Sequence, residues 1–214
     1  MSTLLKRSAV SAVAVAVLLL AGCSKSTTQP SATNQPASAA KPAGPPQLVP
    51  AKTAFWPMYT SAHNWAPDVI TLQVTAKEVP GFKNEAGKAA MWQAAFASPS
   101  LREYRIYSYS IAAVPPDIFK GVDAGLALPW GGITRNAMPV DISLFNVDSD
   151  AAYKAAAADA ADWLKKNPDK SLALFQLGDT FKFSGPVWYL LWGNEKSGYA
   201  AFVDADSGKI LKHK

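Results

Sequence analysis

The stretch that decides the fold of this chain is residues 149–166, SDAAYKAAAADAADWLKK. Its apolar residues recur at helical spacing and form one stripe, flanked by Trp163: Tyr153, Ala156, Ala157, Ala160 and Leu164. Ser149 is a favoured N-cap residue, Asp150 falls in the first turn, and two lysines fall in the last turn, as the helix dipole favours. The sequence therefore predicts one helix that ends before Asn167-Pro168 and packs a small alanine face on a sheet.

Four strand-like segments joined by short turns follow this helix: SLALFQLG (171–178), VWYLLWG (187–193), GYAAFVDA (198–205) and KILK (209–212). Short turns join neighbouring strands in antiparallel order. The predicted fold class is therefore α+β, an antiparallel β-meander packed on one or two α-helices. The segment 187–193 places large apolar groups at successive positions, so either both of its faces are covered or one face meets a partner.

A helix followed by a meander resembles the PepSY domain, a cystatin-like module of bacterial envelope proteins and of some metallopeptidase propeptides. The resemblance covers residues 148–214 and rests on the alanine-rich helix, on VWYLLWG and on FVDADSGKIL (202–211), which resembles the closing hairpin of that family. It implies a modulatory or peptidase-restraining role. The tryptophan strand carries fewer charges here than the family pattern has.

The preceding residues belong to the same predicted domain, 51–214. VITLQVTAK (69–77) and LREYRIYSYSI (101–111) alternate as strands do, and NEAGKAAMWQAAF (84–96) reads as a short helix between them. Residues 112–140, rich in proline and glycine, form a long irregular segment of the kind that is functional or mobile. This half could be a degenerate second copy of the other, but no residue-level repeat is visible.

The front of the chain holds its only cysteine. Lys6 and Arg7 precede an uncharged run too short for a membrane-spanning helix, which needs about 20 residues. The order Leu20-Ala21-Gly22-Cys23 then resembles the lipobox of bacterial lipoproteins. The resemblance implies that residues 1–22 are a signal peptide and that Cys23 becomes the lipidated mature N-terminus. An ordinary signal peptide is the alternative interpretation.

Residues 23–50 are rich in proline, serine and alanine and contain no aromatic or acidic residue. Such a composition cannot bury enough apolar surface to offset chain entropy, so we predict a disordered tether. The predicted location is the bacterial envelope, held to a membrane by lipid. Because Ser24 is not aspartate, the enterobacterial sorting pattern would imply the outer membrane facing the periplasm rather than the inner membrane.

The net charge of +5 does not indicate a nucleic-acid partner. Four of the basic residues lie before position 51, whereas every acidic residue lies after it, so the predicted domain is nearly neutral. It has no basic stripe, and an envelope location disfavours nucleic acid.

Signs of catalysis are few, and the sequence predicts no enzyme, no metal and no cofactor. His63 in SAHNWAPD is a weak candidate for a ligand or base, because a metal site needs three or more converging ligands. NVDSDA and FVDADSG fail the calcium-loop spacing. Asp148 and Asp150 are instead interpreted as helix-start residues, and the Asp204 to Gly208 segment as a hairpin turn.

Trp130, in LPWGG, and Arg135 are the candidate binding residues, because a loop tryptophan beside glycine and proline either pins the loop or anchors a partner. The first functional hypothesis is a non-catalytic, membrane-tethered module that binds or modulates an envelope protein or peptide. The alternative is a carrier or sensor of a small apolar ligand, which the many aromatic residues suggest. A hydrolase using carboxylates or His63 is the third hypothesis.

Overall fold

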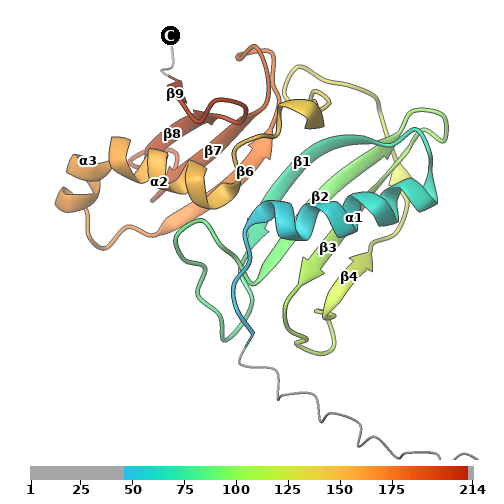
Figure 1. Ribbon diagram of the computed structural model, residues 1–214, viewed down its shortest axis with the longest axis horizontal. Coiled ribbons are helices and arrows are strands. Elements are labelled where there is room, and N and C mark those ends of the chain that lie inside the picture. The colour runs from blue at the N-terminus through green and yellow to red at the C-terminus, as the bar shows by residue number, and fades with distance from the viewer. Residues whose placement is uncertain (1–45, 212–214) are drawn as a thin grey trace, which may run out of the picture. The chain divides into compact units, whose positions relative to one another are not determined.

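The computed structural model describes residues 46–211, and Cys23, residues 1–22 and most of 23–50 lie outside that range. Along the chain, helical structure followed by a set of strands occurs two times (Figure 1). The first set is α1 (Ala51–Trp65), β1 (Ile70–Lys77), β2 (Met91–Ser98), β3 (Glu103–Ser110), β4 (Gly121–Ala124) and β5 (Leu128–Pro129). The second is η1 (Ile142–Leu144), α2 (Ser149–Asp159), α3 (Ala161–Lys166), β6 (Leu172–Gly178), β7 (Val187–Trp192), β8 (Tyr199–Asp204) and β9 (Ile210–Leu211).

The nine strands of residues 46–211 belong to one antiparallel sheet in the order β4-β3-β2-β1-β6-β7-β8-β9, with β5 paired to β3. Helices α1 and α2 share one core on one face of this sheet, which we call the helix face. That core includes Phe55 and Met58 of α1, Ala152 and Ala156 of α2, and the inward side chains of the strands. The predicted α+β class, a β-meander packed on helices, is confirmed.

The sheet order shows that the two halves of the described chain are structural repeats. Each repeat is a helix followed by four strands in meander order, α1 with β1 to β4 and α2 with β6 to β9. The first strands of the two repeats, β1 and β6, pair antiparallel in the middle of the sheet. The question of a second copy, which the sequence left open, is thus answered at the level of structure.

One tryptophan in each repeat gives the alignment of the two halves. Trp92 and Trp188 are the second residues of β2 and β7, and both are fully buried. The indole Nε1 of Trp92 donates to the carbonyl oxygen of Val49 at 2.9 Å, and that of Trp188 donates to Val147 at 2.9 Å. Each acceptor lies two residues before its helix. The two rings also contact each other, with centroids 6.2 Å apart.

The alignment places an approximate two-fold axis at the centre of the sheet. Trp92 pairs with Ala76 and Trp188 with Leu177, so the preceding residues, Thr75 and Gln176, are equivalent. Thr75 and Gln176 also face each other across the β1–β6 pair. A residue paired with its own counterpart lies at the axis, and the whole sheet is therefore a pseudo-symmetric pair of meanders.

The amino ends of α1 and α2 also meet, and they share their caps. Asp148 Oδ1 accepts from the Ser149 N–H of its own helix at 2.7 Å and from the Lys52 N–H of α1 at 3.0 Å. The buried Ser149 hydroxyl accepts from the Ala51 N–H at 2.8 Å. Because α1 follows Pro50, which offers no capping side chain, the second repeat satisfies its free N–H groups.

Helix α1 is the element that sequence reasoning missed. Its caps come from residues nearly a hundred positions away, and Pro57 lies inside it, where proline removes a backbone donor. Ser149 was predicted as the N-cap of its own helix, and this was wrong: Asp148 is the N-cap and Ser149 is the first helical residue. Both positions were read correctly as belonging to a helix start.

The predicted helix at 84–96 is also wrong, because residues 91–98 form β2. Alanine favours helix in isolation, but this segment lies between β1 and β3 and pairs with both along its length. Trp92, Ala94 and Phe96 then alternate on the helix face, and all are fully buried. Tertiary pairing outweighed local propensity, which is a weak preference per residue.

The remaining predicted elements are confirmed with small changes. The helix at 149–166 is divided at Ala160 into α2 and α3, and the four final strands form the expected meander. The Asp204 carboxylate accepts from the N–H groups of Asp206 and Ser207, and Gly208 has a φ of 74°, as the predicted hairpin turn requires. The irregular segment 112–140 contains the short strands β4 and β5.

Candidate functional site

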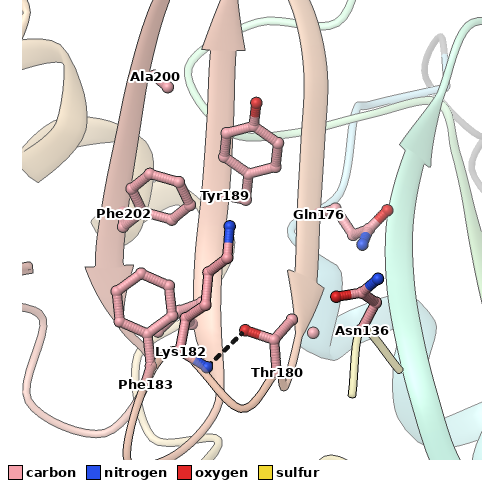
Figure 2. Close-up of a pocket in the computed structure, with 10 residues that line it drawn as sticks. Asn136, Gln176, Thr180, Lys182, Phe183, Tyr189, Ala200 and Phe202 are labelled. Atoms are coloured by element: carbon pink, nitrogen blue, oxygen red, sulfur yellow. Dashed lines mark hydrogen bonds between the residues drawn. The ribbon is translucent and has the colours of Figure 1, made fainter. Parts of the chain in front are cut away.

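The candidate site is a hollow of about 360 Å³ on the face of the sheet turned away from the helices, which we call the far face. Its floor comes from β6, β7 and β8, and its rim comes from residues 180–183 and from the end of the long segment (Figure 2). Its lining residues are Asn136, Gln176, Gly178, Thr180, Lys182, Phe183, Val187, Tyr189, Ala200 and Phe202. The volume is at the lower end of the range for small-molecule sites, so a short segment or small ligand fits.

Strand alternation places these side chains on the far face. Tyr189 lies between Trp188 and Leu190, and both of those are fully buried on the helix face. Phe202 precedes Val203 of the same core and pairs with Tyr189 across β7 and β8. Both faces of this hairpin therefore carry large apolar groups, and the helices cover only one of them.

The floor of the hollow is aromatic. The rings of Tyr189 and Phe202 are 4.9 Å apart between centroids and only 5° from parallel, and Phe183 lies 5.1 Å from Phe202. Tyr189 and Phe202 are half-buried, and Figure 2 shows their rings side by side. Aromatic surface of this kind supplies a large apolar contact area at low entropy cost.

Polar side chains surround this floor on one side. Gln176 of β6 and Asn136 of the long segment lie beside each other in Figure 2, and the Thr180 hydroxyl accepts from the backbone N–H of Lys182 at 3.4 Å. The Lys182 ammonium extends over the hollow toward Tyr189. Burial raises the pKa of the Tyr189 phenol, and the charge of Glu195 raises it further, so the phenol stays neutral at ordinary pH.

The first repeat provides an internal comparison for this floor. Gln93 follows Trp92, just as Tyr189 follows Trp188. Ser108 precedes Tyr109, the strand partner of Trp92, just as Phe202 precedes Val203, the strand partner of Trp188. Gln93 and Ser108 pair with each other as the two aromatic residues do. The same place in the fold is thus built once with small polar groups. The first repeat forms the same strand pairing without an aromatic pair.

The two residues singled out from the sequence lie elsewhere. Trp130 is half-buried and directly follows β5, and its backbone N–H donates to the Arg102 carbonyl at 2.8 Å. Arg135 is exposed, and its guanidinium lies 5.6 Å from the centre of the Phe181 ring. Neither lines the hollow, although Arg135 precedes the lining residue Asn136.

His63 lies on the exposed side of α1, with its Nε2 2.9 Å from the Tyr59 hydroxyl. Within residues 46–211, no group of three or more histidine, cysteine or acidic side chains is arranged to hold a metal ion. In the same range, no helix is long and apolar enough to cross a membrane.

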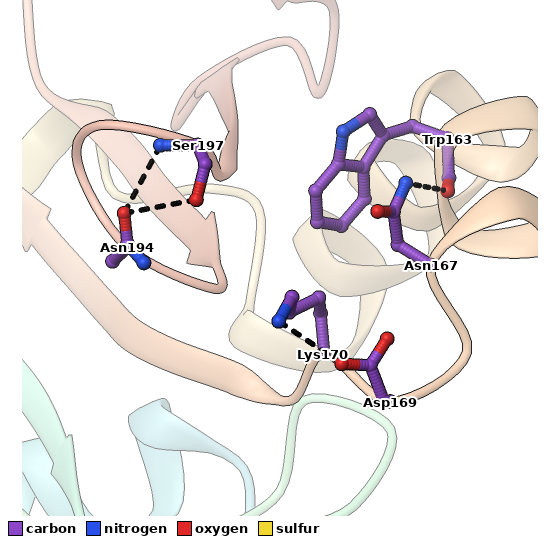
Figure 3. Close-up of polar contacts among 6 residues, drawn as sticks. All are labelled: Trp163, Asn167, Asp169, Lys170, Asn194 and Ser197. Carbon is purple, nitrogen blue, oxygen red and sulfur yellow. Dashed lines mark hydrogen bonds and ion pairs between the residues drawn. The ribbon is translucent and has the colours of Figure 1, made fainter.

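A second group of polar contacts, around the end of α3 and the β7–β8 turn, is local in character (Figure 3). Asn167 Nδ2 donates to the Trp163 carbonyl, which ends the helix, and Asn194 Oδ1 accepts from the N–H and hydroxyl of Ser197 within the turn. The ion pair between Lys170 and Asp169 joins neighbouring residues. These contacts shape a helix end and a turn, and they do not form a cleft.

Comparison with known proteins adds one structural neighbour. No family model and no curated protein matches the chain. Among solved structures, a candidate lipoprotein from Clostridium difficile 630 is similar with a TM-score of 0.44 and 13% identity, over 72% of this chain and 90% of that one. A likeness at this level carries no argument about the site.

Sequence reasoning did not find the hollow. The signal that was available is the aromatic content of residues 187–193 on both faces, which left open whether one face meets a partner. The other floor residues come from different strands, and Asn136 comes from a segment without regular structure. Only the folded sheet brings them together.

Proposed function

We propose that this chain is a non-catalytic lipoprotein of the bacterial envelope that binds a segment of a protein or peptide partner in the hollow of the far face. In this proposal Cys23 carries the lipid, the rest of residues 23–50 forms the tether, and the domain 51–214, with its PepSY-like part at 148–214, forms the binding body. The proposed location of the anchored chain is the periplasmic face of the outer membrane.

One observation carries the proposal: Tyr189 and Phe202 stand where the first repeat has Gln93 and Ser108. These half-buried aromatic side chains gather beside the hollow, and aromatic side chains are common anchors of binding sites. The hollow beside them gives a partner side chain a place to enter.

The experiment is photo-crosslinking in intact cells, with a benzophenone amino acid at Asn136 on the exposed rim. We expect one dominant crosslinked protein, identified by mass spectrometry after purification through this chain. The matched control carries the probe at Lys154, which is exposed on α2. The same proteins at equal yield from both positions, or none from Asn136, would contradict the proposal.

Replacing the aromatic pair by the residues of the first repeat, in the double variant Tyr189→Gln and Phe202→Ser, should abolish crosslinking from Asn136. We expect the variant to fold, with a loss of about 1–3 kcal/mol in the free energy of unfolding, because the first repeat tolerates these residue types at the same place. The control is Gln93→Ala with Ser108→Ala, measured by the same crosslinking yield and by urea denaturation. A folded double variant that crosslinks normally would show that the partner does not use the hollow.

Trp130 is proposed as a second contact point, because the segment around it exposes Leu126, at 85%, and Leu128, at 43%. Trp130→Ala should leave the unfolding midpoint nearly unchanged, since the side chain is only half-buried and its recorded hydrogen bond is made by the backbone. Crosslinking from a probe at Leu126 should fall. Equal yield with and without Trp130 would remove the segment from the binding site.

The second candidate function is a carrier of a small apolar ligand, which the aromatic floor and the modest volume of the hollow favour. Native mass spectrometry of the gently extracted chain distinguishes the carrier function from the binding module. A co-purifying small molecule that is absent from the Tyr189→Gln, Phe202→Ser variant supports the carrier, and its absence together with a crosslinked protein supports the binding module.

A further inference from the structure

The charge of the hollow indicates the chemistry of the partner segment. Among the described residues that line it, Lys182 is the only basic one, and the remaining polar groups are the amides of Asn136 and Gln176 and the hydroxyls of Thr180 and Tyr189. No acidic side chain is among them. Lys182 is therefore the one charged side chain among the lining residues, while Glu195, whose charge raises the pKa of Tyr189, lies outside the lining.

The Lys182 ammonium has no ion-pair partner within residues 46–211. Its side chain is exposed, yet Figure 2 shows it lying over the hollow beside the aromatic floor rather than extending away from it. An ammonium group donates three hydrogen bonds and accepts none, so only an acceptor can satisfy it. Tyr189 beside it is neutral and does not supply a negative charge.

We infer that the hollow takes an acidic peptide segment, in which a carboxylate meets Lys182 and a neighbouring apolar or aromatic side chain lies on the Tyr189–Phe202 floor. This inference rests on the proposed function and names the chemistry of its partner. The side-chain amides of Asn136 and Gln176 lie beside each other among the lining residues and supply donors and acceptors for the backbone of such a segment. Two or three residues fill a hollow of about 360 Å³.

The test uses two peptides that differ only in charge, acetyl-Gly-Phe-Asp-Gly-amide and acetyl-Gly-Phe-Asn-Gly-amide. Each is titrated calorimetrically into the full chain in detergent, with a detergent blank. The aspartate peptide should bind about three- to fivefold more tightly, a difference typical of a partly exposed ion pair. Lys182→Gln should remove the difference, as should salt near 1 M, where the screening length falls to about 3 Å. Lys154→Gln, which makes the same charge change on α2, should keep it.

Two outcomes overturn the inference and are distinguishable. If both peptides bind equally and the Tyr189→Gln, Phe202→Ser variant binds neither, the hollow binds peptide without selecting acid, so the proposed function stands and this inference fails. If neither peptide binds, the acidic-peptide assignment fails, and the proposed function is judged by crosslinking from Asn136. A preference for aspartate that survives Lys182→Gln also overturns it.

Discussion

Trp188→Ala should lower the free energy of unfolding by about 3–5 kcal/mol, the range for removing a fully buried tryptophan. The Trp188 ring is completely buried and contacts three other rings, those of Trp92, Phe145 and Phe175. Its loss also leaves the Val147 carbonyl without the indole donor immediately before α2. The change therefore opens a cavity and loosens the start of a helix together.

Urea denaturation followed by circular dichroism measures this effect. Trp92→Ala is the matched variant, because Trp92 is equally buried and donates to the equivalent carbonyl of the first repeat. Trp56→Ala is the control, since that ring is 46% exposed on α1 and its removal leaves no cavity in the core. A loss below about 1 kcal/mol for Trp188→Ala would contradict the role of the tryptophan pair. Should the variant fail to fold, Trp188→Phe offers a smaller change with the same expected direction.

Asp148→Ala should lower the free energy of unfolding by about 2–3 kcal/mol, more than the loss of an ordinary capping side chain does. Removal of one capping side chain typically costs about 1 kcal/mol and ranges up to about 2 kcal/mol. Asp148 accepts from an N–H of α2 and from an N–H of α1, so the substitution leaves donors of two helices without a partner. The loss should appear in the stability of both repeats at once.

Asp150→Ala is the matched control for this prediction. Asp150 is also an aspartate of the first turn of α2, but it is exposed, and its carboxylate accepts from the adjacent N–H of Ala151 rather than from α1. Asp150→Ala should lower the free energy of unfolding by no more than about 1 kcal/mol, because only the favourable interaction with the helix dipole is lost. Hydrogen exchange of the first turn of α1 gives a second readout. Unchanged exchange at Lys52 in Asp148→Ala would show that the shared cap does not stabilise α1.

The sequence could predict much of the second repeat, because its signals are local. The alanine stripe of 149–166, the strand alternation after it and the glycine turn at 208 all depend on residues within a few positions of one another. The lipobox at Cys23 is a local pattern of the same kind, and it stays a prediction. The class of fold follows from the order of such segments.

The candidate site could not be predicted in the same way. Trp130 and Arg135 stood out because they are conspicuous in the chain, whereas the hollow is formed by residues that the sheet assembles from β6, β7, β8 and the distant Asn136. The meaning of Tyr189 and Phe202 became visible only when the second copy of the fold supplied Gln93 and Ser108 for comparison.

By itself, the sequence determined that a helix and an antiparallel meander end this chain, since hydrophobic period and turn residues act between neighbours. The tertiary structure decided three things that neighbours do not encode: that 91–98 is a strand, that 51–65 is a helix, and that the two repeats meet at Thr75 and Gln176. For 51–65 and for the β1–β6 pair, the deciding hydrogen bonds come from residues about a hundred positions away, whereas 91–98 is held by pairing with its neighbours β1 and β3. In each case these contacts outweigh local preferences of a few tenths of a kcal/mol.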